Sequence, residues 1–333
     1  MKTVVFGAGA WGIALAMLLY ENGHTVTLRS SSPARAAELD DARVNPRLPG
    51  VIIPRGIRVT SSAIAASDGA ELAVLATTST ALQDAAELLR ASLPRECIIV
   101  CGSKGVEADA PRLFSELLRG VFGEARAIAA LSGPAHAEEV ARRIPTACVA
   151  ASRDKSAAET VQDVFMNEYF RVYTSDDVVG VELGAALKNI IALCAGICDG
   201  LGFGDNTIAM LATRGLAEIA HLVIALGGRR ETVAGLTGLG DLIATCTSRH
   251  SRNRRAGVLI GQGKSAREAM DDIGAVVEGY YAAKAARALS QRAGVAMPIC
   301  AEAYSVLYEG KEPLLAIREL MTRTRRSEIE DSW

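Results

Sequence analysis

The sequence predicts an α/β part followed by an all-helical part in one chain of 333 residues. Three observations support this prediction. Short β-branched and apolar runs alternate with helical periodicity over the first half, a glycine-rich turn follows the first run, and the strand pattern stops near residue 175. Such alternation is typical of a doubly wound, mainly parallel sheet with helices on both faces. We therefore expect two domains, residues 1–175 and 176–333.

The composition is that of an ordinary globular protein, with 50% hydrophobic and 22% charged residues. The net charge of -2 gives no global electrostatic reason to bind nucleic acid or an anionic membrane. The first residues lack a charged leader followed by an apolar core, and no apolar run reaches the roughly 18 residues of a membrane span. We expect a cytoplasmic protein without nucleic-acid partners or membrane insertion.

The cysteines and histidines show no metal-ligand spacing. Seven cysteines lie in apolar segments without a C-x-x-C pair, and the four histidines are scattered. We expect buried free thiols and no bound metal.

The first element is a strand from Thr3 to Phe6, which runs into the turn GAGAWG and a helix over Ile13–Tyr20. In such a turn, Gly7 permits the tight bend, Gly9 admits a pyrophosphate close to the backbone, and Gly12 allows the helix to pack. A second strand follows at 25–28, the spacing expected for a Rossmann-type, dinucleotide-binding domain. The predicted cofactor-binding residues of the turn are Gly7, Gly9, Ala10 and Gly12.

The end of the second strand bears on the choice of cofactor. An acid usually stands there in NAD-binding proteins, but this chain has Arg29 and three serines, including Ser31, followed by Arg35. Guanidinium and hydroxyl groups suit the 2′-phosphate of NADPH. We therefore favour NADPH, with NADH as an open possibility and a solvated loop as the bland alternative.

Further strands and helices follow this pair. Polar residues end three of the strands, where ligands bind in doubly wound sheets: the segments 77–79, 103–105 and 132–137. Lys104 could cap a neighbouring helix, but its place at the mouth of the fold favours a ligand role. The expected strands are 57–60, 72–76, 97–100, 127–131, 146–150 and 169–173, with helices at 80–92 and 111–122.

From Ser175 onward the pattern is helical, beginning with an N-cap sequence. The expected helices are 178–198, 205–226, 239–248, 252–261, 265–272, 275–293, 298–308 and 313–323.

Lys188 lies in an apolar helical stretch with small neighbours such as Gly184 and Ala185. On its own it could be a lysine that snorkels to the surface. Alternatively, the small residues leave room for a cofactor and a substrate, and the ammonium exchanges a proton with the substrate.

A phosphate cradle is predicted at the start of a later helix. Ser251, Arg252 and Asn253 offer a hydroxyl, a guanidinium and an amide beside the helix N-terminus. The alternative is an N-cap serine beside solvated arginines. A glycine-rich segment ending in Asp241 is either part of the site or an ordinary helix entry. If both halves bind phosphates, one holds the cofactor and the other a small phosphorylated substrate.

Nine motifs carry a family resemblance that spans nearly the whole chain in order. Together they closely resemble the bacterial NAD(P)-dependent glycerol-3-phosphate dehydrogenases. The motifs are GAGAWG, SKGVE at 103–107, SGPAHA at 132–137, ELGAALKN at 182–189, GFGDN at 202–206, RGLAE at 214–218, GLTGLGDL at 235–242, SRNRRAG at 251–257 and VVEG at 276–279.

The resemblance implies reversible hydride transfer between NAD(P)H and dihydroxyacetone phosphate, giving glycerol 3-phosphate for glycerophospholipid synthesis. It implies that Lys188 is the proton donor and acceptor, with Lys104 and Asp241 as further catalytic residues, and that the protein is a homodimer built through its helical half. The implied substrate contacts are Lys104, Gly133, Ala135, Lys188, Asp241, Ser251, Arg252 and Asn253. The further implied cofactor contacts are Trp11, Arg29, Ser31, Lys104, Ala137, Arg252, Val276 and Glu278.

Three positions depart from the family pattern. The family usually has Ser or Thr at Ala135 and often Phe at His136, and an arginine often found near Ser31 is absent, with Arg29 and Arg35 as substitutes. Two other functions remain open: a related two-domain reductase of a 2-keto or 3-hydroxy acid, and a sensor that binds NAD(P)H without turnover.

Overall fold

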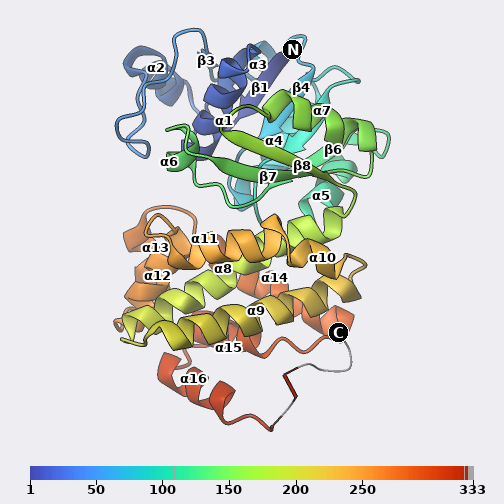
Figure 1. Cartoon of the computed structure of the whole chain (residues 1–333). Helices are drawn as coiled ribbons and strands as arrows, with labels where there is room; N and C mark the ends of the chain where they lie inside the picture. Colours follow the sequence, from blue (N-terminus) through green and yellow to red (C-terminus); the bar gives the residue numbers. More distant parts are fainter. Residues whose placement is uncertain (108–109, 326, 329–333) are drawn as a thin grey trace. The chain divides into compact units, whose positions relative to one another are not determined.

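The computed structural model describes residues 1–107, 110–325, 327 and 328. The chain forms two compact units (Figure 1). The first comprises residues 1–104 and 112–182, and the second comprises 105–111 and the chain from 183 onward. The division falls inside one long helix, α8 (Val178–Gly200).

The first unit is built on an eight-stranded sheet with the order β3-β2-β1-β4-β5-β6-β7-β8. All eight predicted strands are present, and the sheet is mainly parallel as expected. The exception is β7, which pairs antiparallel with β6 across a connection that contains only a four-residue helix, α6 (Ala137–Val140). The strands are β1 (Lys2–Phe6), β2 (Thr25–Arg29), β3 (Arg58–Thr60), β4 (Leu72–Leu75), β5 (Ile98–Cys101), β6 (Ile128–Ser132), β7 (Thr146–Ala151) and β8 (Phe170–Ser175).

Helices cover both faces of this sheet (Figure 1). On one face, α1 (Ala10–Glu21), α2 (Pro33–Ala42) and α7 (Lys155–Phe165) contribute buried side chains to a core with the strands. On the other face, α3 (Ala63–Ser67), α4 (Leu82–Arg90) and α5 (Phe114–Phe122) build a second core. Four helices of this unit, α2, α3, α6 and α7, were not predicted from the sequence.

The strand order places a topological switch point beside β1. The chain moves outward from β1 to β2 and β3, then returns to place β4 on the other side of β1. The turn after β1 therefore lies against the end of β4: a Cβ added at Gly7 would stand 2.3 Å from the Ala76 carbonyl oxygen. Gly7 also has φ +118°, a conformation that favours glycine, so both local geometry and packing require it.

The second unit is all-helical in the residues that the structure describes. The predicted helices are present with small shifts, and the short α10 was not predicted. The segment predicted as one helix from 239 begins as a π-helical stretch, η2 (Leu236–Gly240), and α14 starts at Glu278 rather than 275. The helices after α8 are α9 (Asp205–Ala225), α10 (Arg230–Val233), α11 (Asp241–Thr247), α12 (Arg252–Gly261), α13 (Ala266–Ile273), α14 (Glu278–Ala293), α15 (Pro298–Tyr308) and α16 (Pro313–Met321).

Helix α8 packs tightly against α12 through glycines. A Cβ at Gly196 would lie 2.0 Å from the Arg254 carbonyl oxygen, and one at Gly257 would lie 2.0 Å from the Leu193 carbonyl oxygen. At Gly184 the added Cβ would meet the Thr237 carbonyl oxygen at 3.1 Å. The expectation that the small residues beside Lys188 leave room for ligands is therefore wrong for Gly184, because neighbouring backbone occupies that space.

Two helices, α8 and α9, are long and apolar enough to cross a membrane by length and composition. The expectation that no stretch reaches this threshold is therefore corrected. In α8, 89% of the apolar window is buried inside the protein, which is typical of a core helix, and in α9 44% is buried.

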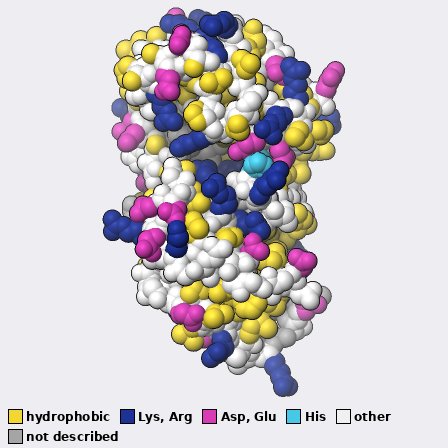
Figure 2. All heavy atoms as spheres, turned by 90° about the vertical axis from the view of Figure 1, so that its left-hand side faces the viewer, with side chains coloured by type: hydrophobic (Ala, Val, Ile, Leu, Met, Phe, Trp, Pro, Cys, Tyr) yellow, Lys and Arg dark blue, Asp and Glu magenta, His cyan; other side chains and the backbone are white. Residues whose placement is uncertain are grey.

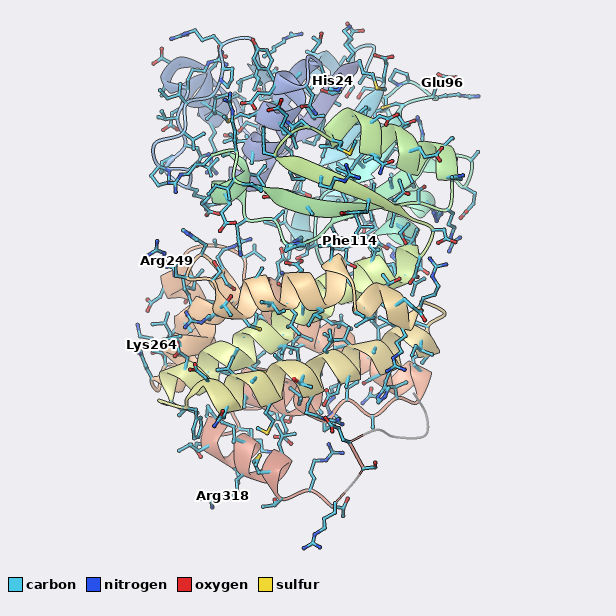
Figure 3. The ribbon with its side chains drawn as sticks, viewed as in Figure 1. His24, Glu96, Phe114, Arg249, Lys264 and Arg318 are labelled. Atoms are coloured by element: carbon cyan, nitrogen blue, oxygen red, sulfur yellow. The ribbon has the colours of Figure 1, made fainter. Side chains whose placement is uncertain are left out.

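On the face in Figure 2, acidic and basic side chains are intermixed, and Figure 3 shows Lys264 and Arg318 extending from the second unit.

Candidate functional site

Hydrogen bonds tie together the loops that follow the central strands of the first unit. The Trp11 indole donates to the Gly102 carbonyl at 2.9 Å, which links the glycine turn to the end of β5. The Lys104 ammonium donates to the Gly133 carbonyl at 2.7 Å, which links β5 to the loop after β6. The structure thus brings together two predicted substrate contacts, Lys104 and Gly133, and connects Trp11 to the same set of loops.

The glycine turn has open space where a phosphate is expected. Gly9 is the N-cap of α1 with no side-chain cap, and no atom lies within 4 Å of a Cβ built there. By contrast, a Cβ at Gly12 would lie 1.8 Å from the Gly7 carbonyl oxygen, so Gly12 serves the internal packing of the turn. Exposed backbone amides at the start of a 12-residue helix, with room in front of them, fit a dinucleotide pyrophosphate.

At the end of β2, the groups offered to a 2′-phosphate are fewer than the sequence indicated. Ser30 is buried, and the Ser32 hydroxyl accepts from the Arg35 amide as the N-cap of α2. Arg29 is half-buried: its Nε donates to the Ser61 carbonyl at 3.2 Å, and its guanidinium lies 5.1 Å from the centre of the Phe6 ring. Ser31 is exposed.

The loop after β6 is shaped by Gly133, whose φ of +151° suits glycine. A Cβ there would lie 2.8 Å from the Ala147 carbonyl oxygen, so the loop passes close to β7. Ala135 and Ala137 pack half-buried against the core of the first unit, and His136 is the N-cap of α6. The departures Ala135 and His136 therefore lie in a loop whose backbone is well fixed.

In the second unit, Lys188 is held in the interior. Its side chain is 6% exposed and that of Asp241 is 3% exposed, and the ammonium donates to the Asp241 carboxylate at 2.9 Å. The ammonium also donates to the Thr245 hydroxyl at 2.6 Å. The reading of Lys188 as a lysine that snorkels to the surface is therefore wrong.

Thr245 is a site residue that the sequence analysis missed. Its hydroxyl donates back to the Asp241 carbonyl at 2.6 Å while it accepts from Lys188. The sequence did contain a signal, because a residue four positions after Asp241 on a helix lies on the same face, one turn further on.

Burial controls the protonation of the Cys246 thiol, which follows Thr245 in the chain. Desolvation raises the pKa of Cys246 to about 12, although Lys188 and Arg254 act in the opposite direction. At neutral pH this cysteine is therefore a packed thiol rather than a nucleophile.

The predicted phosphate cradle lies at the N-terminus of α12. Ser251 is the N-cap, is almost fully buried, and accepts from the Arg254 amide at 3.2 Å. Arg252 is exposed, and its Nη1 donates to the Val276 carbonyl at 2.9 Å. Arg252, a predicted contact of both substrate and cofactor, is therefore hydrogen-bonded to Val276, a predicted cofactor contact.

Both polar atoms of the Asn253 side-chain amide are hydrogen-bonded. Its Nδ2 donates to the Asn189 side-chain oxygen at 2.9 Å, and its Oδ1 accepts from the Gly279 amide at 2.9 Å. Asn189 and the backbone of Gly279 thus orient Asn253. Next to Gly279, Glu278 is the first residue of α14.

Comparison with known proteins assigns the chain to a family. Residues 2–158 match the family model described as NAD-dependent glycerol-3-phosphate dehydrogenase N-terminus, and residues 177–318 match its C-terminus counterpart. The chain belongs to the NAD-dependent glycerol-3-phosphate dehydrogenase family. This confirms the resemblance carried by the nine motifs.

Individual relatives match this family member along almost its full length. A glycerol-3-phosphate dehydrogenase (NAD(P)+) of Lysinibacillus sphaericus is 48% identical over 333 residues, 99% of this chain and 98% of its own. One of Moorella thermoacetica is 50% identical over 327 residues, 98% of this chain and 97% of its own. The crystal structure of glycerol-3-phosphate dehydrogenase from Coxiella burnetii matches with a TM-score of 0.92 and 36% identity, covering 96% of this chain and 98% of that one. The two-part fold, with its Rossmann-type first unit, is therefore that of the family.

Proposed function

We propose that this protein is an NAD(P)-dependent glycerol-3-phosphate dehydrogenase that interconverts dihydroxyacetone phosphate and glycerol 3-phosphate, and so supplies glycerophospholipid synthesis. Membership of the family supports the reaction class. The observation that carries the proposal is the buried Lys188, held by Asp241 and Thr245 in the helical unit. An ammonium fixed in this way is suited to exchange a proton with a substrate oxygen.

Each catalytic residue has a separate task in this proposal. A nicotinamide cofactor, held by the residues of the glycine turn, would supply or accept a hydride at C2 of the substrate. Lys188 donates a proton to the C2 oxygen during reduction and removes it during oxidation, and Asp241 and Thr245 keep its ammonium in place. Lys104, fixed by its bond to the Gly133 carbonyl, adds positive charge for the substrate and the cofactor.

The start of α12 supplies the phosphate site in this proposal. Ser251 and Asn253 are held by bonds within the second unit, while Arg252 is exposed. A phosphate at a helix N-terminus is stabilised by backbone amides and the helix dipole, and a guanidinium adds paired hydrogen bonds. Val276 and Glu278 would then contact the cofactor next to Arg252.

The cofactor site is assigned to the first unit. Gly7, Gly9, Ala10, Trp11 and Gly12 would receive the pyrophosphate. Ala137 would line the same site, and Ser31 with Arg29 would face the adenosine ribose. The absence of an acid at the end of β2 supports NADPH as the preferred cofactor.

Arg29→Gln tests this preference. We expect the KM for NADPH to rise about tenfold, because one charge-assisted phosphate contact is lost, while the KM for NADH changes little. Arg58→Gln, which changes an exposed arginine on β3, is the matched control. An equal change for both cofactors would place the 2′-phosphate elsewhere.

The reaction itself is tested by following NADPH and NADH absorbance with dihydroxyacetone phosphate, ketopantoate and other 2-keto acids. We expect turnover only with the phosphorylated ketone. Lys188→Ala should lower kcat by about 10²–10⁴-fold, the range typical of a lost general acid. A variant as active as the wild type would disprove the role of Lys188.

Arg252→Ala tests the phosphate site. The KM for dihydroxyacetone phosphate should rise about a hundredfold because a guanidinium–phosphate pair is lost. Arg255→Ala, at an exposed position on the same helix, is the control. An unchanged KM in the first variant would move the phosphate site away from α12.

The alternative substrate class is a non-phosphorylated 2-keto or 3-hydroxy acid. A carboxylate would not need the combined hydroxyl, guanidinium, amide and helix N-terminus at Ser251, Arg252 and Asn253. A sensor without turnover would not need both Lys104 and Lys188. Both alternatives predict no oxidation of NADPH with dihydroxyacetone phosphate.

We further propose a cytoplasmic homodimer, without membrane insertion, in which residues 1–175 bind the cofactor and 176–333 bind the substrate. The extensive burial of α8 supports a core rather than a membrane role for this helix. Sedimentation velocity tests the dimer, and cell fractionation tests the location.

A further inference from the structure

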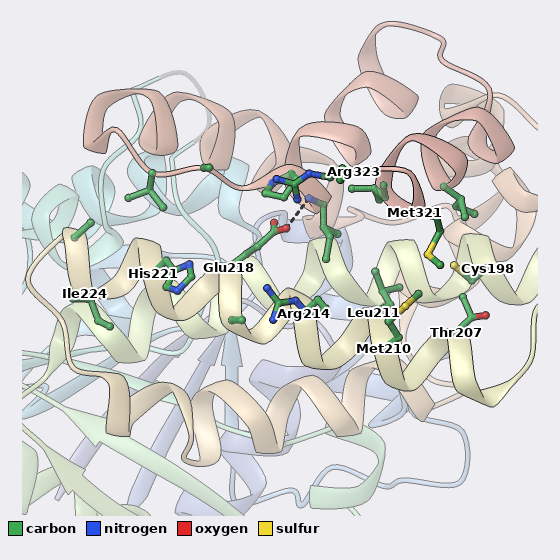
Figure 4. Close-up of a pocket in the computed structure, with 18 of the residues that line it drawn as sticks. Cys198, Thr207, Met210, Leu211, Arg214, Glu218, His221, Ile224, Met321 and Arg323 are labelled. Atoms are coloured by element: carbon green, nitrogen blue, oxygen red, sulfur yellow. Dashed lines mark hydrogen bonds between the residues drawn. The ribbon is translucent and has the colours of Figure 1, made fainter. Parts of the chain in front are cut away.

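A cavity in the second unit lies outside the groups assigned to the reaction. It has a volume of about 580 Å³, within the range of roughly 300–1,000 Å³ typical of small-molecule sites. One face of α9 lines it, together with the start of α15 and the end of α16 (Figure 4). Neither Lys188 nor the segment 251–253 lines this cavity.

The RGLAE motif at 214–218, which the proposed reaction does not use, forms part of this lining. Arg214 and Glu218 are one helical turn apart and both face the cavity (Figure 4). Between them, Gly215 packs on α8: a Cβ there would lie 2.6 Å from Ile191 Cδ1. The motif thus contacts α8 on one side of α9 and the cavity on the other.

Glu218, the acidic residue of the motif, is hydrogen-bonded to backbone amides of the protein itself. The Glu218 carboxylate accepts from the Ile299 amide at 2.8 Å and the Cys300 amide at 3.2 Å, so it caps the N-terminus of α15. Burial raises its pKa to about 7, while nearby Arg323 favours its charged form. Backbone donors and an arginine therefore offset the negative charge that Glu218 would present to an anionic ligand.

Among the described residues of the lining, the remaining charged side chains are basic. Arg214 and Arg323 lie near the middle of the cavity, where Figure 4 shows both arginines close to Glu218. Arg214 Nη1 already donates to the Glu328 carbonyl oxygen at 3.3 Å, and this bond is not the only interaction of the Arg214 side chain. A carboxylate is a stronger acceptor for a guanidinium than a peptide carbonyl is, because it is charged and can be held by two parallel bonds.

One end of the cavity is apolar and rich in sulfur. Cys198, Met210, Leu211 and Met321 line it (Figure 4). Along α9, the distance from Arg214 to Thr207 at this end is about 10 Å, seven residues at the helical rise. Flexible methionines adapt to aliphatic chains of varied shape.

We propose that this cavity binds an aliphatic carboxylate of medium chain length. The head group pairs with Arg214 and Arg323, and the chain lies between Leu211, Met210 and Met321. The apolar lining favours the chain, and the two guanidinium groups select an anionic head group over a cationic one. This site is separate from the proposed reaction, so its test requires neither substrate nor cofactor.

Isothermal titration calorimetry of the full chain with decanoate tests the proposal. We expect one saturable site per chain, with no binding of acetate, which lacks the chain, or of decyltrimethylammonium, which reverses the charge. Arg214→Gln and Leu211→Trp should each weaken decanoate binding at least about tenfold, by removing a charged partner and by filling the apolar end. Arg267→Gln and Leu88→Trp, at exposed positions outside the cavity, should leave binding unchanged.

Several results would overturn the proposal. They are no binding of decanoate, equal binding by the variants and the wild type, or equally tight binding of the cationic amphiphile. If Leu211→Trp does not fold, as judged by thermal unfolding, Arg214→Gln decides alone. If decanoate does not bind and sedimentation velocity shows a dimer that Leu211→Trp dissociates, the cavity belongs to an interface between two copies of the chain.

Discussion

Lys188 and Asp241 form a 2.9 Å ion pair that the second unit buries almost completely. Removing one partner leaves an uncompensated charge in the interior, which typically costs about 3–5 kcal/mol. We therefore expect Asp241→Leu to lower the free energy of unfolding by about this amount. Urea denaturation measures the change.

The double variant Lys188→Met/Asp241→Leu separates stability from catalysis. Replacing both partners by apolar side chains of similar size is often neutral. It should therefore recover most of the lost stability while remaining inactive. A double variant as unstable as the single one would show that the ion pair itself, rather than the avoidance of a lone charge, stabilises the fold.

Thr245 should affect turnover more than substrate binding. Thr245→Val keeps the shape but loses the 2.6 Å bond from Lys188. Hydrogen bonds to charged groups contribute about 1.5–3 kcal/mol, so we expect kcat to fall by about ten- to a hundredfold with little change in KM. Thr245→Ser retains the hydroxyl and should restore most of kcat. If serine and valine variants are equally impaired, the methyl packing matters and the hydroxyl does not.

The contact between α8 and α12 should tolerate no added methyl group. Gly196→Ala would place a Cβ 2.0 Å from the Arg254 carbonyl oxygen, so the two helices must move apart. Overpacking of this kind costs about 1–3 kcal/mol, and the KM for dihydroxyacetone phosphate should rise because α12 carries Ser251 to Asn253. Gly204→Ala is the control, since no atom lies within 4 Å of its Cβ. Thermal unfolding and steady-state kinetics measure both effects.

The raised pKa of Glu182 predicts that the free energy of unfolding depends on pH. Its carboxylate accepts from the Ser115 amide at 2.9 Å and the Ser115 hydroxyl at 2.6 Å, and burial raises its pKa from 4.5 to about 7. Between these values the folded state holds a proton that the unfolded state has lost, so stability falls as pH rises, by up to about 1.4 kcal/mol per pH unit.

Glu182→Gln should remove this contribution. Glutamine stays neutral at every pH but offers one acceptor oxygen to the two Ser115 donors. The variant should therefore be less stable than the wild type at pH 5, and the difference should shrink towards pH 8. Urea unfolding over this range measures it, with the exposed Glu268→Gln as the control. A constant difference would mean that Glu182 does not titrate there.

The strands of the first unit were predictable because they are short runs rich in β-branched and apolar residues, bounded by turn residues. Helices α2, α3 and α6 were missed for two different reasons. In α2 only Ala36 and Leu39 are buried, so it lacks an apolar stripe, and α3 and α6 are too short to show periodicity. Helix α7 did carry such a stripe, including Val161 and Val164, and an Asp154 N-cap, so this signal was readable.

The residues of the candidate site that belong to local sequence motifs were predictable, whereas the contacts that depend on tertiary structure were less so. Lys188, Asp241 and the segment 251–253 stand out by residue type. That Asn189 orients Asn253 follows only from the arrangement of α8, α12 and α14. Periodicity also cannot reveal whether a small residue faces a ligand or another backbone, which is why Gly184 was misread.

The bonds from Trp11 to Gly102, from Ser103 to Thr77 at 2.7 Å and from Lys104 to Gly133 join the loops after four neighbouring strands. The conformational entropy of these loops is thus lost during folding rather than when a ligand arrives. Cofactor association should accordingly be fast and limited by diffusion and orientation, with little delay from loop ordering.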